Sequence, residues 1–452
     1  MISRFCRPLG AALAIPALAT LALAAALWAA APARATEIQA LISPGGVAAW
    51  LVTEPSIPMI SLELAFRGGS ALDPEGKEGL AHMVSGLLDE GAGEMDGLTF
   101  QLRLEELAIG LSFSASFDTF RVTLKTLSKN RDEAFRLLGL ALARPRFEET
   151  AVERIRQQIR TGLIRSLEDP DTIANRRWFA EAFPDHPYGR PSGGTLESIA
   201  AITGDDLGAF AAGRLARDNM VVGAVGDIDG AELGRLLDLA LSGLPAASKP
   251  YRIAETRPAA GDGVIVVKKD IPQSVVVFGR AGIKRDDPDY YAAYVMNYVL
   301  GGGGFSSRLT EEVREKRGLA YSVYSYLYPL DHAGLMLGGV ATANARVAES
   351  VRIIRAELER LRRDGITARE LADAKTYLNG SFPLRLSSNR RIANILVAIQ
   401  LEDLGIDYLE RRADFINAVT LSDVARVTAR LIKPRDLIVV VVGDPVGLGS
   451  GG

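Results

Sequence analysis

The stretch MVVGAVGD at residues 220–227 has a counterpart near the end of the chain, LIVVVVGD at residues 437–444. Both stretches are runs of apolar and β-branched residues that end in Gly-Asp, and such runs are typical of buried β-strands. Two similar strands so far apart in one chain suggest that a single structural unit is built twice.

The residues before the two strands match as well. IAAIT at residues 199–203 corresponds to INAVT at residues 416–420, and each Thr is followed three positions later by an Asp. Thr-x-x-Asp is a helix N-cap pattern. The Thr residues of the two copies are 217 positions apart, and so are the Asp residues that end the two strands. This period is too long for a solenoid repeat and indicates a duplicated domain.

The duplication predicts two tandem homologous domains at residues 36–244 and 263–447. The linker at residues 245–262 is rich in Pro, Ala and Gly, and residues 448–452 are expected to form a disordered tail. Each half follows the order strand, two helices, strand hairpin, longer helices and final strand. This order predicts an α+β fold, in which each domain is an antiparallel-rich sheet packed with helices.

Length and composition describe an ordinary globular protein. The chain has 452 residues, a formal charge of -3, 48% apolar residues and 24% charged residues. A chain of this length is expected to contain more than one domain and a large core. There is no sustained basic patch, so nucleic acid is not expected as a partner.

The first 35 residues differ from the rest. Two arginines precede an apolar stretch at residues 9–31, and ARA at residues 33–35 matches the cleavage site of a secretory signal peptide. We expect export to the periplasm, with no stable membrane anchor after cleavage. A retained anchor is the alternative, since the apolar stretch is long. Cys6 is the only cysteine and lies in this segment, so the mature chain would contain no thiol.

The first chemical motif is GLAHMVSGLL at residues 79–88, which has helical spacing. It resembles the helix of the insulinase/pitrilysin (inverzincin) family of zinc peptidases that carries H-x-x-E-H. In that motif the two His bind zinc and the Glu activates the attacking water. Here His82 matches the first His, but Ser85 stands at the position of the Glu and Gly86 at that of the second His.

The family's third zinc ligand is a Glu on a later helix. RQQI at residues 156–159 is the best match and places Gln158 at that position, 76 residues after His82. A neutral amide is a poor zinc ligand, and one ligand of three does not hold the ion. The resemblance thus implies a degenerate zinc site and no cofactor in this chain. His82 is then expected to be a helix residue satisfied by local hydrogen bonds.

A second matching segment is HPYGRP at residues 186–191, followed by GTLESI at residues 194–199. It closely resembles the family's segment after its third long helix. The pattern is that of a loop and a helix cap, so we expect His186 to be a turn residue rather than a catalytic one.

The strongest match is LGGGGFSSRL at residues 300–309, which continues as EVREKRGLAYSV at residues 312–323. The resemblance implies that Gly301, Gly302, Gly303 and Gly304 take part in substrate binding, as a hinge or entry flap. A flexible connection between helices is the alternative for the glycines, and a solvated helix face is the alternative for Arg308 and Arg314. A phosphate loop is not expected, because no Lys follows at Walker spacing.

Arg314 and Tyr321 match an Arg and a Tyr that family members supply from the second domain toward the zinc site of the first. A zinc-polarised carbonyl develops negative charge when it is attacked. A guanidinium and a phenol aimed at that oxygen would stabilise it as an oxyanion hole does. The resemblance therefore assigns Arg314 and Tyr321 a catalytic role.

In two-chain relatives, such as mitochondrial processing peptidase, one chain carries H-x-x-E-H and its partner lacks it. The present sequence resembles the partner, similar to the alpha-type subunit. The resemblance implies a chain that is inactive alone and completes the peptide-binding chamber of a zinc-containing catalytic subunit. The first alternative is a scaffold or assembly protein of the same fold, for which Arg314 and Tyr321 would have no use. A self-sufficient peptidase, the second alternative, conflicts with Ser85 and Gly86.

Overall fold

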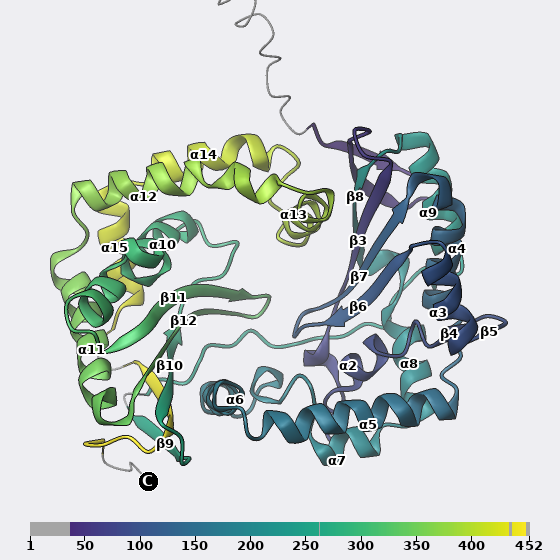
Figure 1. Cartoon of the computed structure of the whole chain (residues 1–452). Coiled ribbons are helices and arrows are strands. Elements are labelled where there is room, and N and C mark those ends of the chain that lie inside the picture. The colour runs from purple at the N-terminus through teal and green to yellow at the C-terminus, as the bar shows by residue number, and fades with distance from the viewer. Residues whose placement is uncertain (1–36, 262, 434–435, 449–452) are drawn as a thin grey trace, which may run out of the picture.

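The computed structural model describes residues 37–261, 263–433 and 436–448 (Figure 1). The predicted signal peptide, at residues 1–35, and the last four residues of the predicted tail lie outside the described residues. None of the helices in the described part of the chain is both long and apolar enough to cross a membrane.

The first half is built on one mixed sheet. Its strand order is β1-β2-β8-β3-β7-β6, and every pair is antiparallel except β2 and β8. The strands are β1 (Gln39–Ile42), β2 (Ala48–Thr53), β3 (Met59–Arg67), β6 (Gly110–Ala115), β7 (Thr119–Leu127) and β8 (Met220–Gly226).

The first half also contains helices, not all of which pack on this sheet. They are α2 (Leu80–Ser85), α3 (Gly97–Glu106), α4 (Arg131–Ala143), α5 (Glu149–Ser166), α6 (Pro170–Ala182), α7 (Leu196–Ala201), α8 (Gly204–Arg214) and α9 (Gly230–Leu241), with short helical turns η1 (Ser70–Leu72), η2 (Ser128–Asn130), η3 (Pro187–Gly189) and η4 (Arg217–Asn219) and a small hairpin of β4 (Gly91–Ala92) and β5 (Met95–Asp96). Alternate β3 residues such as Ile60, Leu62 and Leu64 form a core with Leu137 of α4 and Leu236 of α9. The period of two places the hydrophobic face of the sheet under these helices.

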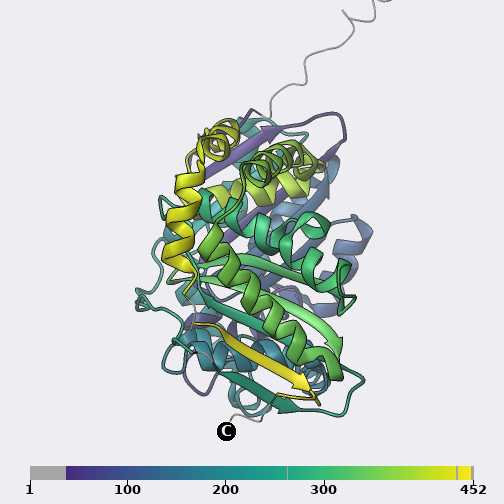
Figure 2. The same cartoon turned by 90° about the vertical axis from the view of Figure 1, so that its left-hand side faces the viewer.

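The second half repeats this plan with the strand order β11-β12-β10-β13-β9. The strands are β9 (Val264–Lys268), β10 (Gln273–Ala281), β11 (Ala320–Leu330), β12 (Ala333–Ala343) and β13 (Ile438–Gly443). The helices are α10 (Tyr290–Asn297), α11 (Val347–Asp364), α12 (Ala368–Gly380), α13 (Asn389–Leu401), α14 (Tyr408–Ala418) and α15 (Leu421–Leu431), with shorter turns η5 (Tyr298–Gly302), η6 (Gly304–Ser306), η7 (Thr310–Glu315), η8 (Asn344–Arg346) and η9 (Phe382–Leu386). Figure 2, viewed from the side of this half, shows helices lying over the outer face of the sheet.

The predicted duplication is confirmed in detail. Strands β8 and β13 occupy equivalent places, since each pairs in parallel with one neighbour and antiparallel with the other. Thr203 and Thr420 each form a capping box with the Asp three positions later. Each strand ends in a glycine with positive φ, +147° at Gly226 and +149° at Gly443. A Cβ at these positions would lie 2.1 Å from the carbonyl oxygen of Met59 and 2.2 Å from Oγ of Ser274, respectively. Glycine is therefore required in both copies.

Each half places one helix on the inner face of the other half's sheet. Helix α6 of the first half packs on β10 and β13, and α13 of the second half packs on β3 and β8. Trp178 of α6 is fully buried there, and its indole N–H donates to the carbonyl of Ile438 over 3.3 Å. Gln400 of α13 donates in turn to the carbonyl of Val222 over 2.9 Å. This exchange buries both faces of each sheet and fixes the two halves to each other.

Candidate functional site

Helix α2 presents His82, and Asp73 fixes the start of this helix. The Asp73 carboxylate accepts hydrogen bonds from the backbone N–H groups of Gly79, at 2.8 Å, and Ala81, at 3.0 Å. Asp73 is buried, and this burial outweighs the hydrogen bonds and raises its pKa to about 7. Its carboxyl group thus ties the residues that precede α2 to the first turn of the helix.

The His82 residue is exposed, yet the protein around its imidazole partly excludes water and lowers its pKa. The imidazole makes no hydrogen bond with any described residue. The prediction that local hydrogen bonds satisfy this side chain is therefore wrong for the described chain. His82 keeps a free ring that faces a cavity.

The other two positions of the degenerate motif, Ser85 and Gly86, offer no side chain to a metal ion. The Ser85 hydroxyl is buried and donates to the carbonyl oxygen of His82 over 2.7 Å, which turns it back onto the helix. At Gly86 an added Cβ would lie 3.3 Å from Cγ2 of Ile155 on α5. A larger side chain at position 86 would require Ile155 to move.

Gln158 lies on α5, a later helix as the family resemblance implies, and the fold brings it to the cavity of His82. Both residues line one cavity of about 310 Å³. Their donor set is one imidazole and one neutral amide, which does not fit zinc. Within residues 37–448, the described positions contain no group of three or more His, Cys, Asp or Glu that could hold a metal ion. His82 and Gln158 therefore line a cavity and do not form a zinc site.

The glycine segment divides into a packed part and an open part. Gly301 is buried in the π-helical turn η5, where a Cβ would lie 2.4 Å from Oγ of Ser325 on β11. Gly304 has a φ of +56°, and an added Cβ would meet nothing within 4 Å. Gly301 thus allows close packing against the edge strand, and Gly304 supplies the left-handed turn that leads into Phe305. A hinge or substrate-binding role for the four glycines stays a prediction.

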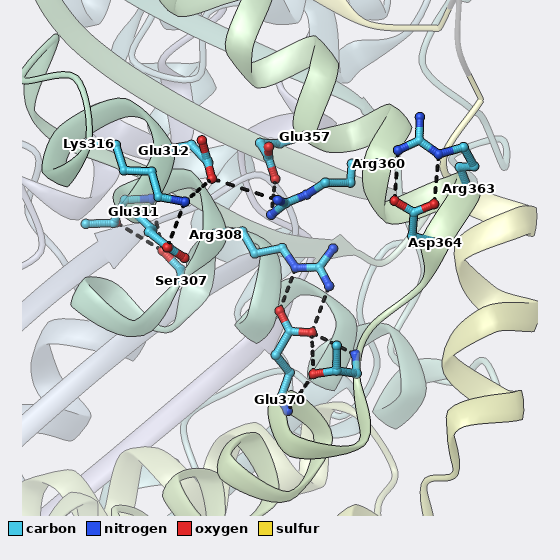
Figure 3. Close-up of polar contacts among 12 residues, drawn as sticks. Ser307, Arg308, Glu311, Glu312, Lys316, Glu357, Arg360, Arg363, Asp364 and Glu370 are labelled. Carbon is cyan, nitrogen blue, oxygen red and sulfur yellow. Dashed lines mark hydrogen bonds and ion pairs between the residues drawn. The ribbon is translucent and has the colours of Figure 1, made fainter.

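Arg308 is part of the structural frame behind this segment (Figure 3). It is 8% exposed, and its Nε and Nη2 donate to the two carboxylate oxygens of Glu370 at 2.6 Å and 2.7 Å. Nη2 also donates to the carbonyl of Gly365. Burial would raise the pKa of Glu370, but Arg308 and the capping bonds of Thr367 together lower it to about 2. A solvated helix face is therefore the wrong interpretation for Arg308.

A second ion-pair group lies on the next turn (Figure 3). The buried carboxylate of Glu312 accepts from Lys316 at 2.7 Å and from Arg317 at 2.6 Å, and Arg360 of α11 lies 3.8 Å away. The hydrogen bonds from Lys316 and Arg317 lower the pKa of Glu312. The three contacts fix η7, the turn that carries Arg314, against α11.

Arg314 and Tyr321 are brought together, but neither belongs to that frame. The Arg314 guanidinium carbon lies 5.1 Å from the ring centre of Tyr321 and 4.6 Å from that of Phe305. Tyr321 is 85% exposed and Phe305 is 73% exposed. Such cation–π contacts orient a guanidinium without occupying its hydrogen-bond donors. The only ion pair of Arg314 with a described residue is a 3.4 Å contact with Glu315.

Tyr321 lies on β11, which is one of the two edge strands of its sheet, as β6 is of the other sheet. Figure 1 shows both edge strands on the sides of their sheets that face the other half of the chain. The backbone groups on the outer side of an edge strand are open to pairing with another extended chain. No hydrogen bond or ring contact joins the Arg314 and Tyr321 pair to His82 and Gln158 within the described residues.

The structure also clarifies residues beside these motifs. His186 caps the turn η3, because its Nδ1 accepts from the backbone N–H of Tyr188 over 3.2 Å, and the predicted turn role is confirmed. Sequence reasoning missed Phe305, although an aromatic residue directly after four glycines is a signal. It also missed Arg176 of α6, which lines the cavity of His82 and carries no motif signal.

Family comparisons agree with this geometry. The family described as Insulinase (Peptidase family M16) matches residues 50–196, and the family described as Peptidase M16 inactive domain matches residues 201–378. Among curated proteins, the chain is 34% identical over 333 residues to the "Non-peptidase homolog YmxG" of Helicobacter pylori, which covers 73% of this chain and 76% of that protein. It is also 26% identical over 407 residues to an uncharacterized zinc protease of Streptomyces coelicolor, with 88% of each chain covered.

Solved structures show the same fold. The crystal structure of a peptidase M16 inactive domain from Pseudomonas fluorescens superposes with a TM-score of 0.85 at 28% identity, covering 91% of this chain and 99% of that chain. A protease from Helicobacter pylori superposes with a TM-score of 0.82 at 22% identity, covering 90% and 99%, and supports the fold alone. The two-domain α+β prediction is thus confirmed.

Proposed function

Because this chain belongs to the M16 peptidase family and resembles its inactive members, we propose that it is the non-zinc subunit of a two-chain metalloendopeptidase. A homologous subunit with an intact H-x-x-E-H motif would hold the zinc and the general base. This chain would close the peptide-binding chamber and present Arg314 and Tyr321 to the bound peptide. The predicted export signal supports a periplasmic location for the pair.

One observation carries the proposal. The chain has lost two of the three zinc ligands and the general base, but Arg314, which is half-buried, and Tyr321, which is exposed, stay outside the surrounding ion-pair frame. Buried ion pairs hold the neighbouring Arg308 and Glu312. A scaffold protein would gain nothing from a guanidinium and a phenol held together at the surface, whereas a peptide carbonyl under attack is stabilised by both.

Peptide binding would use the edge strands β6 and β11, although the carbonyls of Val323 and Ser325 on β11 already accept hydrogen bonds from Thr310 and Asn297. An extended peptide that pairs with such an edge gains main-chain hydrogen bonds with little demand on its sequence. The alternation of β11 places Tyr324 and Tyr326 on one face, and both are exposed. Their rings, stacked at 6.1 Å between centres, would contact apolar side chains of the peptide.

The test is reconstitution. The purified mature chain should contain no stoichiometric zinc and cleave no peptide, and mixing it with an H-x-x-E-H chain co-purified from the same cell should produce activity. The partner alone is the control. Equal activity of the partner with and without this chain would reject the proposal and favour a scaffold role. Zinc at about one ion per chain, together with peptidase activity of this chain alone, would reject the degenerate-site argument.

A further inference from the structure

Two cavities adjoin along helix α6. The first is the 310 Å³ cavity of His82 and Gln158. The second, of about 610 Å³, is lined by residues of α6 and by the loop at residues 189–195. Arg176 and Gly193 line both cavities, so these two residues mark the place where the cavities meet. The volume of the larger cavity is typical of sites for small organic ligands.

The larger cavity has an aromatic wall. The rings of Phe117 and Phe179 lie with their centres 5.4 Å apart, and both residues are half-buried. Phe179 is held in place by edge contacts with Trp178, at 5.2 Å, and Tyr328, at 6.4 Å. The wall is therefore a fixed apolar surface that an aromatic or large aliphatic side chain can contact.

Arg176 supplies a cation with no partner among the residues that the structure describes. It makes no hydrogen bond or ion pair with any residue in the described ranges, whereas its neighbour Arg177 pairs with Glu181 at 2.6 Å. The second cation of the cavity, Arg190, donates to the carbonyl of Ala71 and lies 3.8 Å from Glu78. A half-buried guanidinium without a protein partner has all five of its N–H donors available for an anion.

The carboxylate of the cavity does not occupy Arg176. Asp171 lies in the first turn of α6, and five residues of an α-helix separate the two side chains by about 7 Å along the helix axis. Burial and the charge of Asp169 raise the pKa of Asp171. Asp171 therefore lies near the start of α6, and the guanidinium of Arg176 lies where the larger cavity meets the cavity of His82.

From this geometry we infer a binding site for the free C-terminal carboxylate of a short peptide whose last side chain is aromatic or large and apolar. The carboxylate pairs with the guanidinium fork of Arg176, and the side chain lies against Phe117 and Phe179. A planar fork and a carboxylate form two parallel hydrogen bonds, which single out a free terminus from a peptide that continues. The site belongs to this chain alone and does not depend on the proposed catalytic partner.

The experiment measures binding to the purified mature chain by calorimetry. The probes are N-acetyl-Ala-Phe as the free acid, the same dipeptide as its C-terminal amide, and N-acetyl-Ala-Gly as the free acid. We expect saturable binding of the first probe, with the amide at least about tenfold weaker because the charged hydrogen bonds are lost. The glycine probe should also be weaker, because it lacks the ring that contacts Phe117 and Phe179.

Arg176→Ala should remove the difference between acid and amide, and Arg177→Ala is the matched control on the same helix that should retain it. Arg176→Lys, which keeps the charge without the fork, should give an intermediate difference. Unchanged thermal melting of the variants separates a lost contact from a lost fold. Three results would each overturn the inference: no saturable binding of the free acid, equal affinity for acid and amide, or the same effect from Arg176→Ala and Arg177→Ala.

Discussion

The guanidinium of Arg314 lies over the ring of Tyr321, 5.1 Å from its centre, at the start of the edge strand β11. The two residues are seven positions apart, and the chain turns between them at Gly318, which has a φ of +57°. This turn returns the chain from η7 to β11 and so sets the two side chains against each other. Both groups retain hydrogen-bonding capacity that the described protein does not use.

Arg314→Ala and Tyr321→Phe should each lower kcat of the reconstituted two-chain peptidase by about 10²-fold, if they act as oxyanion donors. Neither variant should change the free energy of unfolding by more than about 0.5 kcal/mol, because both side chains make only surface contacts. Steady-state kinetics and thermal melting provide the two measurements. Tyr377→Phe, at a tyrosine that is 57% exposed on α12, is the control. Loss of complex assembly in size-exclusion chromatography would instead make the pair structural.

Rebuilding the metal site should require all of its lost parts. We expect the triple variant Ser85→Glu, Gly86→His and Gln158→Glu to bind about one zinc per chain, measured by elemental analysis, since the chain would then supply three ligands and the general base. The double variant that keeps Gly86 should bind none. Adding Ile155→Ala to the triple variant should increase its zinc affinity, because it removes the Cγ2 methyl that would lie 3.3 Å from the new Cβ and makes room for the imidazole. Stoichiometric zinc in the unmodified chain would contradict this reasoning.

Glu370→Gln should destabilise the chain by about 2 kcal/mol, because Arg308 would remain buried without its counter-charge. The pKa of Glu370 is lowered to about 2 in the folded chain, so its contribution is present above its unfolded value near 4.5 and is lost as the pH falls toward 2. Urea unfolding at pH 7 and at pH 3 measures both effects. Asp364→Asn breaks the exposed pair with Arg363 and should change stability by less than about 0.5 kcal/mol. Equal losses of stability for the two substitutions would show that burial gives the Arg308–Glu370 pair no larger contribution than an exposed pair.

Asp73 should give the opposite pH dependence. Its folded pKa is raised to about 7, so its protonated form favours the folded state below its unfolded value of about 3.8. That stability is lost as the pH rises through 7, by roughly 4 kcal/mol at most. Unfolding of Asp73→Asn beside the unmodified chain, from pH 4 to pH 8, measures the difference. The difference should narrow or reverse in favour of the Asn variant as the pH rises, and parallel profiles would argue against a buried neutral carboxyl group.

Several features of the fold could be predicted because they depend on local patterns. Short local patterns predict the Gly-Asp ends of β8 and β13 and the helix caps at Thr203 and Thr420. These features can be identified without information about distant contacts. The place of Gln158 on a helix near His82 is implied by the family resemblance, and both residues line one cavity. The signal peptide, the domain boundaries and the catalytic role of Arg314 and Tyr321 stay predictions.

Other features required the folded chain. Arg308 and Arg314 lie in one helical stretch and look alike in sequence, yet α12 supplies Glu370 to the first, while the rings of Phe305 and Tyr321 flank the second. Within the described residues, the imidazole of His82 and the guanidinium of Arg176 have no hydrogen-bond partner, and sequence alone does not show this. Such differences depend on which distant element packs against a side chain.

The sequence by itself therefore determined the duplicated α+β plan and the loss of the zinc ligands, because both are properties of residue type and spacing. Only the tertiary structure decided that α6 and α13 are exchanged between the two sheets and that Arg176 lies where two cavities meet. The physical reason is that a sequence pattern shows which face of a helix is apolar but not which sheet that face packs against. The choice among possible partners is made by shape, burial and hydrogen bonding across the whole chain.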